Sequence, residues 1–519
     1  MKKQFIILTL LLSVLPALAD VRLPAIFSDH LVLQRDASVP VWGWAEPGEE
    51  VTVEFAGQKK TAKADAKGKW MVKLDPMPAS AEPRELIVSG NPKSKIQNLK
   101  CSDILVGEVW LGSGQSNMAM LVQSSNNYEQ EKAAANFPKL RMFTVERNPQ
   151  RTPQADCKGS WKLTTPDNVG PFSAALYFFG RDLHKKLSVP VGLINSSYGG
   201  TDIAAWTSED AQMKVPELKA AFEKWAKDDA AYVPEKAQAN FEKQQAAWKE
   251  AAKKARTAGK QIPRAPRPPV QPRLSQNHPA NLYNGMIAPI LPYGIRGAIW
   301  YQGEHNASVV GGPLYAKQLP LLIKDWRTRW GCEFPFAWVQ LPNFLRPGDG
   351  WMLVRESMLK SLSVPKTGMA ITMDIGDPQD IHPKNKQDVG KRLALWALGT
   401  VYGEKVPAIS GPLPAGHKIS GGEIVLSFKH TNGGLVAKGG ALKWFVVAGA
   451  DKQWKPATAR IEGDKVIVSS AEVPKPVAVR YAWSDNPDCN LFNGAGLPAS
   501  PFRTDNWPCE EQLAQPQRK

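Results

Sequence analysis

Ser116 lies in a loop whose sequence suits a catalytic nucleophile. The stretch 112–118 reads GSGQSNM and directly follows the apolar run 109–111. Glycine accepts backbone angles that other residues avoid, so such a loop can turn sharply at the end of a strand. Open α/β sheets bind their ligands at the carboxyl ends of their strands, where this turn would leave the Ser116 hydroxyl. The loop lacks the Gly-x-Ser-x-Gly pattern of the α/β-hydrolase elbow, so its role depends on finding a base.

His382 has the surroundings that a general base for Ser116 would need. The segment 374–383 reads DIGDPQDIHP and follows the strand-like run 369–373, so three carboxylates crowd one imidazole. A carboxylate beside such a histidine orients the ring and stabilises the imidazolium that forms when the ring takes a proton. The chain has 7 histidines, so six others remain. Four of them lack such neighbours and are predicted to be structural, namely His30, His184, His417 and His430. The other two, His278 and His305, lie nearer to other motifs.

Two further loops offer donors that would stabilise an oxyanion. The stretch 198–201 reads YGGT and would expose the backbone N–H of Gly200. The stretch 300–306 reads WYQGEHN and carries the side-chain amides of Gln302 and Asn306. Fixed N–H donors aimed at a developing negative charge are a main electrostatic device of acyl-transfer enzymes. Together with the two loops above, they predict a nucleophile, a base, an acid and donors at one sheet edge.

These loops need a largely parallel sheet to bring them together. Between residues 100 and 405, buried apolar runs alternate with stretches of helical spacing, which is typical of βαβ units. The strand-like runs are 104–106 with 109–111, 189–194, 297–301, 336–341 and 369–373, and the helical ones are 172–187 and 314–330. Parallel strands end at the same edge of a sheet, so the loops after them would meet there. We therefore predict the α/β fold class for this part of the chain.

The flanking regions show a different, β-rich pattern. Residues 20–99 alternate apolar and polar side chains in short runs broken by turns, which predicts an N-terminal antiparallel β-sandwich. A similar pattern returns over 406–519 and predicts a C-terminal β-rich region. The interval near 209–275 is rich in Ala, Lys, Glu and Gln and ends in the proline-rich stretch 263–269. We interpret this interval as a solvated helical insertion rather than a site for a polyanion.

Composition and the first residues indicate where this protein works. The chain has 519 residues, 43% of them apolar and 22% charged, which excludes collagen-like, coiled-coil and largely disordered proteins. Residues 1–19 begin with two lysines, continue with an apolar run and end in Ala-Leu-Ala, as a signal peptide does. We therefore expect an exported protein, periplasmic or extracellular, with no later membrane span. Export argues against a nucleic-acid partner despite the net charge of +16.

The cysteines and histidines do not suggest a metal site. No cluster of them has the spacing of zinc ligands, so we expect neither a metal nor another cofactor. The chain has 5 cysteines, an odd number, which leaves at least one without a disulfide partner. Cys489 and Cys509 would close a short loop and are the first pair to test.

Motifs in several of these loops resemble those of one known family, the sialate O-acetylesterases of the SGNH hydrolase superfamily. The motifs are GQSNM at 114–118, GGT at 199–201, WYQGE at 300–304 and DIHP at 380–383, with FSDH at 27–30 and NGAGLP at 493–498. They occur in the family's order and cover nearly all of the chain beyond residue 20. The resemblance implies a flavodoxin-like SGNH hydrolase domain over 100–405, flanked by the β-rich regions. It also implies a serine esterase that removes acetyl groups from sugar hydroxyls without a metal.

The same resemblance implies a role for each site residue. Ser116 looks like the nucleophile and His382 like the general base. The oxyanion would be held by the N–H groups of Ser116 and Gly200 and by one side-chain amide, that of Gln302 or Asn306. The substrate partner implied by these roles is an O-acetylated glycan, which would pass through an acetyl-enzyme.

The acid of the site is assigned on its spacing from the histidine. The wider superfamily has an Asp three residues before the histidine, but this chain has Gln379 there. Asp380 is two residues before His382, and an extended segment puts both side chains on one face. Asp377 is the second choice. Glu304 is a further group that would orient His382 or a sugar hydroxyl.

The sequence leaves three functions open. The first is a secreted serine esterase that acts on O-acetyl groups of sialic acids or related glycans. The second keeps this chemistry and acts on acetylated xylan, xyloglucan or another plant polysaccharide. The third is a non-catalytic protein whose aromatic β-rich regions bind glycans. The oligomeric state and the acetylated position of the sugar do not follow from the sequence.

Overall fold

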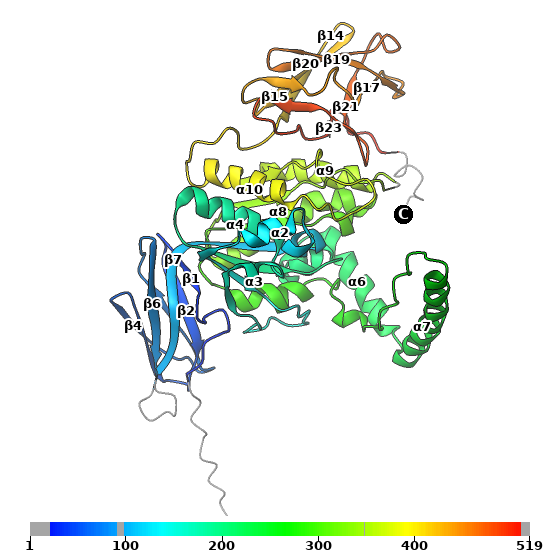
Figure 1. The fold of residues 1–519 in the computed structure, drawn as a ribbon. Coiled ribbons are helices and arrows are strands. Elements are labelled where there is room, and N and C mark those ends of the chain that lie inside the picture. The colour runs from blue at the N-terminus through cyan, green and yellow to red at the C-terminus, as the bar shows by residue number, and fades with distance from the viewer. Residues whose placement is uncertain (1–20, 91–97, 347, 510–519) are drawn as a thin grey trace, which may run out of the picture.

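The computed structural model describes residues 21–90, 98–346 and 348–509 (Figure 1). A body of helices and strands, built on one large sheet, occupies the middle of the chain, and β-rich parts lie at both ends. The predicted signal peptide at residues 1–19 and the end of the predicted C-terminal region at 510–519 lie outside the described residues. Within the described residues, no helix is both long and apolar enough to cross a membrane.

Six parallel strands form the core of the central sheet. In spatial order they are β13 (Thr367–Ala370), β12 (Phe336–Val339), β11 (Gly297–Tyr301), β7 (Asn98–Gly114), β10 (Val191–Ser197) and β8 (Phe137–Thr144). Neighbours in this row pair in parallel, and β9 (Trp161–Thr164) is added beside β8 as an antiparallel edge strand. The inner strands are continuous buried apolar runs, as parallel strands covered by helices must be. All six therefore end at one edge of the sheet.

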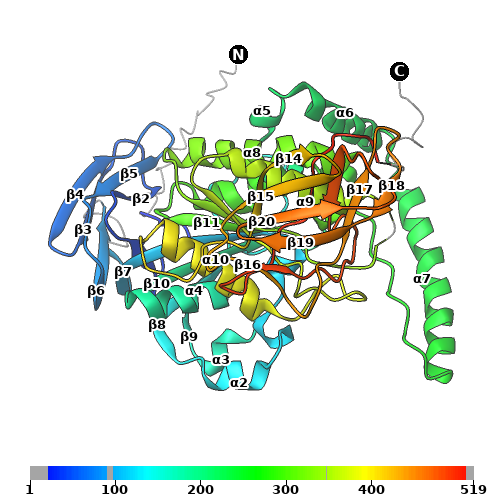
Figure 2. The same ribbon diagram turned by 90° about the horizontal axis from the view of Figure 1, so that it is seen from above.

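Helices cover both faces of this sheet. One face carries α4 (Ala174–Leu187) and α10 (Lys386–Thr400), and the other carries α8 (Gly311–Trp330) and α9 (Gly350–Lys360). In Figure 2, α8 and α4 lie on opposite sides of β7 and β11. Short helices lie in the connections, namely α1 (Ser116–Ala119), α2 (Tyr128–Ala133), α3 (Pro166–Val169) and α5 (Glu209–Gln212).

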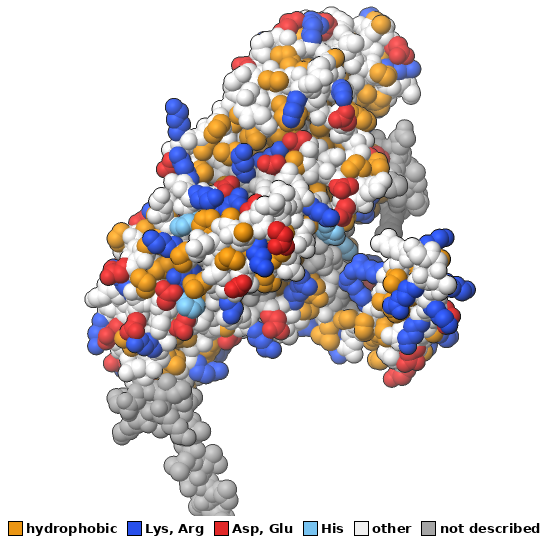
Figure 3. Space-filling model, viewed as in Figure 1, with side chains coloured by type: hydrophobic (Ala, Val, Ile, Leu, Met, Phe, Trp, Pro, Cys, Tyr) orange, Lys and Arg blue, Asp and Glu red, His pale blue; other side chains and the backbone are white. Residues whose placement is uncertain are grey.

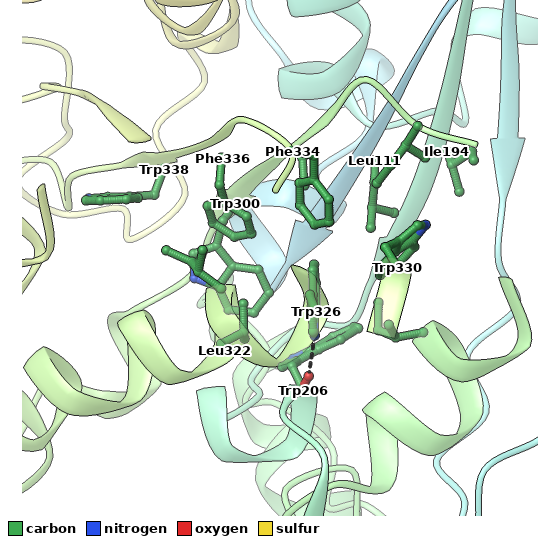
Figure 4. Packing of buried hydrophobic residues seen from close by; sticks show 14 of the residues in the cluster. Leu111, Ile194, Trp206, Trp300, Leu322, Trp326, Trp330, Phe334, Phe336 and Trp338 are labelled. Atoms are coloured by element: carbon green, nitrogen blue, oxygen red, sulfur yellow. Dashed lines mark hydrogen bonds between the residues drawn. The ribbon is translucent and has the colours of Figure 1, made fainter. Parts of the chain in front are cut away.

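An aromatic cluster fixes two of the edge loops to α8. Trp300, one residue before the end of β11, packs edge-on against Trp206 and Trp326, with ring centroids 6.0 Å apart in both pairs (Figure 4). The Trp326 indole N–H donates to the Trp206 carbonyl over 2.9 Å. All three rings are fully buried. Because large aromatic rings contribute strongly to core stability, this cluster holds the chain after β10 in place relative to the end of β11.

Strand β7 continues from the N-terminal strands into the central sheet. Its first part pairs antiparallel with β6 (Ser80–Ser89), and its last part pairs in parallel with β10 and β11. The domain boundary predicted after residue 99 falls inside this strand. The other N-terminal strands are β1 (Val32–Gln34), which is parallel to β7, and the antiparallel β2 (Val39–Trp44), β3 (Glu50–Phe55), β4 (Gln58–Lys63) and β5 (Lys69–Leu74).

The C-terminal strands form antiparallel sheets. One contains β14 (Leu413–Ser420), β15 (Glu423–Lys429), β20 (Lys465–Ser469) and β19 (Thr458–Glu462), and a second contains β18 (Trp454–Pro456), β17 (Phe445–Ala448), β21 (Ala478–Tyr481) and β23 (Phe502–Arg503). A third pair joins β16 (Leu435–Ala437) to β22 (Leu491–Asn493). Cys489 is a free thiol, so the disulfide considered between it and Cys509 is not formed.

Two long helices lie between β10 and β11. They are α6 (Pro216–Ala230) and α7 (Pro234–Thr257), and each begins with a proline. Proline is favoured there because the N–H groups of the first turn make no hydrogen bond within the helix. Apart from Leu218 and Ala252, the residues of both helices are at least partly exposed. In Figure 1, α7 stands out from the body. The chain then runs over 260–271 without helix or strand before it rejoins the body.

Candidate active site

The end of β7 presents Ser116 at the carboxyl edge of the sheet. Gly114 has a φ of +137°, and a Cβ at this position would lie 2.2 Å from the Tyr301 carbonyl oxygen, so only glycine fits this turn. The Gln115 N–H donates to the same carbonyl over 2.9 Å, which ties the loop to the neighbouring strand β11. Helix α1 begins at Ser116 itself. The serine therefore follows its strand in a fixed position, although the loop lacks the α/β-hydrolase pattern.

His382 lies against this serine. Its Nε2 is 2.8 Å from Ser116 Oγ, although 266 residues separate the two in the chain. Its Nδ1 lies 3.7 Å from Asp380 Oδ1, which is within ion-pair range but longer than a hydrogen bond. The same Asp380 oxygen accepts the His382 backbone N–H over 2.9 Å, so this carboxylate also shapes the loop. The structure thus brings together the three residues expected to be nucleophile, base and acid.

The surroundings of His382 favour its neutral form. Partial burial lowers the pKa of His382 from its ordinary value of 6.5, and the positive charges of Lys386 and Arg264 lower it further. The negative charge of Asp380 acts in the opposite direction without reversing the shift. A neutral imidazole at neutral pH is able to accept the proton of a serine hydroxyl.

The other two acids of this loop are engaged elsewhere. Asp377 Oδ1 accepts the backbone N–H groups of residues 379–380, at 2.9 and 3.2 Å. Asp374 forms a two-pronged ion pair with Arg392, at 2.6 and 2.8 Å. Among the described residues, neither carboxylate bonds to the histidine. Asp380 is therefore the acid that the geometry favours, and Asp377 serves to close its own turn.

Gly200 offers a backbone N–H beside Ser116. Gly199 approaches the serine so closely that a Cβ there would lie 3.2 Å from Ser116 Cβ, and Gly200 has a left-handed φ of +68°. Gln276 Nε2 donates to the Gly199 carbonyl over 3.0 Å and steadies this turn. Within the part of the chain that the structure describes, the N–H groups of Ser116 and Gly200 donate to no protein acceptor. Both are available to an oxyanion.

The amides of Gln302 and Asn306 are used elsewhere. Gln302 is fully buried, and its Nε2 donates to the Thr201 carbonyl over 2.9 Å and to Asn306 Oδ1 over 2.7 Å. Asn306 Nδ2 donates to Asp202 Oδ1 over 3.1 Å. A buried amide must satisfy its N–H groups, and these two do so by holding the turn after β10. Neither residue lines the cavity of the nucleophile, so this geometry gives no support to an oxyanion role for Gln302 or Asn306.

A buried hydrogen-bond network lies behind Ser116. Asn117 Nδ2 donates to Glu304 Oε1 over 2.5 Å and to the Ile381 carbonyl over 2.9 Å. Lys386 Nζ donates to Asn117 Oδ1 over 2.8 Å. The network therefore ties helix α1 to the loop that carries the histidine. It gives Glu304 a supporting position, as its motif suggested, but through Asn117 rather than through the imidazole.

Burial disfavours the charged forms of both ionisable groups in this network. It raises the pKa of the Glu304 carboxyl and lowers that of the Lys386 amine to about 7. Glu304 lines the cavity, and its Oε2 has no hydrogen-bond partner within the described structure. Sequence reasoning missed Asn117 and Lys386. Asn117 stands inside the GQSNM motif, which is a usable signal, whereas a buried lysine at the start of a helix looks like any surface lysine.

Ser116 and His382 lie on the wall of a cavity of about 1300 Å³. This volume exceeds that of pockets for drug-sized ligands and leaves room for several sugar units. Apolar side chains of residues 119–121 line one part of it. Four arginines also line it, namely Arg147, Arg264, Arg267 and Arg346. Among the described residues, no group of three or more His, Cys, Asp or Glu side chains is placed to hold a metal ion.

A serine hydroxyl held on a neutral histidine, at the carboxyl edge of a parallel sheet covered by helices, defines a serine hydrolase of α/β fold. The cavity beside the pair would admit a polar substrate of considerable size. Similarity to known proteins narrows this class further.

A family model described as carbohydrate esterase, sialic acid-specific acetylesterase, matches residues 106–232 and 273–398. The sialate O-acetylesterases of Rattus norvegicus and Homo sapiens are 30% and 29% identical to this chain, over 93% of its length and 94% and 92% of theirs. The crystal structure of a carbohydrate acetylesterase from Xanthomonas citri is 40% identical, with a TM-score of 0.78, and the match covers 94% of this chain and 100% of that one. The chain belongs to the sialate O-acetylesterase family and is a carboxylic ester hydrolase, which confirms the family that the motifs predicted.

Proposed function

We propose that this chain is an exported serine esterase that removes O-acetyl groups from sialic acids or related glycans through an acetyl-enzyme. The observation that carries the proposal is the 2.8 Å contact between Ser116 Oγ and His382 Nε2 on the wall of a large cavity. The names of the curated relatives supply the substrate class. The predicted signal peptide at residues 1–19 is the reason for proposing export.

The strand order supports a flavodoxin-like SGNH hydrolase domain flanked by the β-rich parts. With β8 and β9 set aside, the parallel strands lie in the order β10-β7-β11-β12-β13, which is 2-1-3-4-5 along the chain. This is the order of flavodoxin-like sheets, whose ligands bind where the connections change direction beside the first strand. Ser116 follows the first of these strands, Gly200 the second and His382 the fifth.

In the first half of the proposed reaction, Ser116 Oγ attacks the acetyl carbonyl carbon while His382 Nε2 takes the hydroxyl proton. The carbonyl oxygen becomes an oxyanion, to which the N–H groups of Ser116 and Gly200 donate. The negative charge of Asp380 stabilises the imidazolium. The bond to the sugar oxygen then breaks, His382 returns the proton to that oxygen, and the acetyl group stays on Ser116.

In the second half, a water molecule attacks the acetyl carbonyl and gives its proton to His382 Nε2. The same two N–H groups hold the second oxyanion. Its collapse breaks the bond to Ser116 Oγ, which regains the proton from the imidazolium. The product leaves as acetic acid, which gives its remaining proton to the solvent to become acetate. The cycle closes with one water consumed and with the chain's own residues restored.

Replacement of Ser116 by alanine tests the nucleophile. Ser116→Ala should lower the hydrolysis of an aryl acetate by about 10⁴-fold or more. The melting temperature should not change, because the substitution removes one oxygen at the cavity wall and no buried packing. The exposed Ser160→Ala is the matched control and should keep the activity. Rapid quenching of the wild type with aryl acetate should also leave an acetyl group on the peptide that contains residue 116. Activity retained by Ser116→Ala would refute the assignment.

A second candidate substrate class is acetylated xylan, xyloglucan or another plant polysaccharide. It is kept because the solved relative at 40% identity is described only as a carbohydrate acetylesterase. Acetate release from O-acetylated sialic acid and from these polysaccharides, with Ser116→Ala as the blank, decides between the two classes. A higher kcat/KM on a plant polysaccharide would replace the substrate class and leave the mechanism intact. The non-catalytic alternative is set aside, because the chain belongs to a family of esterases.

Export is tested separately. The full chain and a chain that begins at residue 20 are expressed in the same bacterium, and esterase activity is measured in the cell, the periplasm and the medium. Activity outside the cytoplasm should depend on residues 1–19. Equal distribution of the two chains would contradict the export proposal.

A further inference from the structure

A proline-rich segment after α7 crosses back to the active site. We call this segment, residues 260–271, the strap. The stretches matched by the family model end at 232 and resume at 273, so the strap lies outside both of them. In Figures 1 and 2, the chain after α7 returns from that outlying helix to the body. The strap is therefore a part of this chain that the family model does not describe.

The strap is anchored at both ends. Near its start, the Trp248 indole N–H on α7 donates to the Pro263 carbonyl over 2.7 Å. Just beyond its end, the Arg273 N–H donates to Asp229 Oδ1 on α6 over 3.1 Å. Prolines within it fix the backbone angle φ at about −65° and limit the number of conformations. The strap thus has a defined path between two helices and the body.

The strap lines the same cavity as the nucleophile. Arg264, Arg267 and Val270 stand on the cavity wall together with Ser116 and His382. The pKa of His382 is lowered mainly by burial, and the charge of Arg264 makes a small contribution in the same direction. A substrate whose acetyl group reaches the serine would therefore pass beside these two guanidinium groups.

The cavity carries an excess of positive charge. Among the described residues that line the cavity, Glu304 carries the one carboxyl group. Burial disfavours the charged form of this group. Arg264 and Arg267 are exposed, and no described carboxylate forms an ion pair with either of them. Arg147 likewise has an aromatic neighbour, Tyr198, rather than an acid, with 5.0 Å between its guanidinium carbon and the ring centroid. In Figure 3, Lys and Arg side chains also gather on α7 and on the body beside it.

We propose that Arg264 and Arg267 of the strap bind the carboxylate of an acidic sugar, and so select acidic over neutral acetylated glycans. This inference rests on the proposed esterase function and names the residues that set its specificity. The planar guanidinium group can donate two parallel hydrogen bonds to the two oxygens of a carboxylate. A neutral sugar has no carboxylate to accept them. Because prolines hold the strap, less conformational freedom is lost when the glycan binds. The segment interpreted from sequence as merely solvated thus acquires a binding role.

Paired substrates that differ only in charge test this specificity. The probes are O-acetylated N-acetylneuraminic acid and its carboxamide, in which the negative charge is absent, and acetate release is measured for both. The wild type should have a higher kcat/KM for the acid. In the double variant Arg264→Gln/Arg267→Gln, the acid-to-amide ratio of kcat/KM should fall by about tenfold or more, mainly through KM, because the charge-assisted hydrogen bonds to the carboxylate are lost.

A matched control removes two positive charges elsewhere on the insertion. Lys254 and Arg256 are exposed on α7 and do not line the cavity, so Lys254→Gln/Arg256→Gln should keep the wild-type ratio. Salt provides a second readout, since about 1 M NaCl shortens the Debye length to about 3 Å. The wild-type ratio should fall in salt, and the ratio of the strap variant should change much less. Any effect of a variant on the chemical step is common to both substrates and cancels in the ratio.

The outcomes separate this inference from the proposed function. Equal kcat/KM for acid and amide in the wild type, or an unchanged ratio in the strap variant, would overturn the inference. The esterase function would stand in that case, provided that the wild type hydrolyses an aryl acetate and Ser116→Ala does not. Absence of Ser116-dependent hydrolysis would instead overturn the proposed function and this inference together.

Discussion

Lys386 should make the stability of this protein depend on pH in a way that one substitution removes. The side chain is fully buried, and burial lowers the pKa of its amine from 10.5 to about 7. In the unfolded chain the amine is in water and keeps a pKa of about 10.4. Between these two values the unfolded chain binds one proton more than the folded chain, so the free energy of unfolding rises with pH. The destabilising effect of the buried charge is complete below the folded pKa and disappears as the pH approaches the unfolded one.

The magnitude follows from the proton difference. Each pH unit over which the two states differ by one proton changes the free energy of unfolding by about 1.4 kcal/mol. At about pH 7 the buried amine is half protonated, so the rise from about pH 7 to about pH 9 is about 2 kcal/mol. Lys386→Met replaces the amine by an uncharged side chain of similar length. This variant should lack the rise.

Urea denaturation at pH values of about 7 and 9 measures the effect. Groups remote from Lys386 that titrate in this range, including buried cysteine thiols, are present in both proteins and cancel in the difference between them. Lys384→Met, at an exposed position just before α10, is the matched control and should keep the wild-type rise. An equal rise in the wild type and in Lys386→Met would refute the reasoning.

Two further predictions concern the rate. Because the pKa of His382 is lowered from 6.5, kcat/KM for an aryl acetate should fall only as the pH drops below that value, and Lys386→Met should move this fall to higher pH by removing a positive charge. If kcat/KM already fell while the pH was lowered from about 8 to about 7, the expectation of a low pKa for His382 would be contradicted. Asp380→Asn should lower kcat/KM by about tenfold, because a half-exposed carboxylate at 3.7 Å acts through its charge. A loss near 10⁴-fold in stopped assays would instead indicate a tight hydrogen-bonded triad.

The meeting of Ser116 with His382 could be predicted from the sequence. Both residues stand in loops that directly follow apolar runs, and parallel strands deliver such loops to one edge whatever their order in the sheet. Glycines around the serine indicated the tight turn that the Tyr301 carbonyl requires at Gly114. Burial pattern and loop position were therefore sufficient for the two groups that touch.

The direction of individual polar side chains could not be predicted. Gln302 and Asn306 stand in the expected loop, but their amides bond to each other and to the turn after β10. Which partner a buried amide chooses depends on acceptors that come from distant parts of the chain. The same holds for Lys386, whose partner Asn117 lies 269 residues away.

The path of the strap was also hidden in the sequence. Alanine- and lysine-rich helices with a proline-rich exit are typical of solvated segments, and most residues of α6 and α7 are indeed exposed. The hydrogen bonds from Trp248 to Pro263 and from Arg273 to Asp229 fix the two ends of the strap, and its residues between them line the cavity. Isolated contacts of this kind leave no periodic signal in the sequence.

The continuity of β7 affects how the protein unfolds and where the chain can be divided. This single strand of 17 residues pairs with the N-terminal strand β6 and with the central strands β10 and β11. Unfolding of either group of strands therefore removes hydrogen-bond partners from the other. The N-terminal strands and the central sheet should therefore unfold together, and heating should give one calorimetric transition for both. Grafting another cap onto this enzyme therefore demands a splice before β7 begins, since a cut at residue 99 would sever the strand that ends beside the nucleophile.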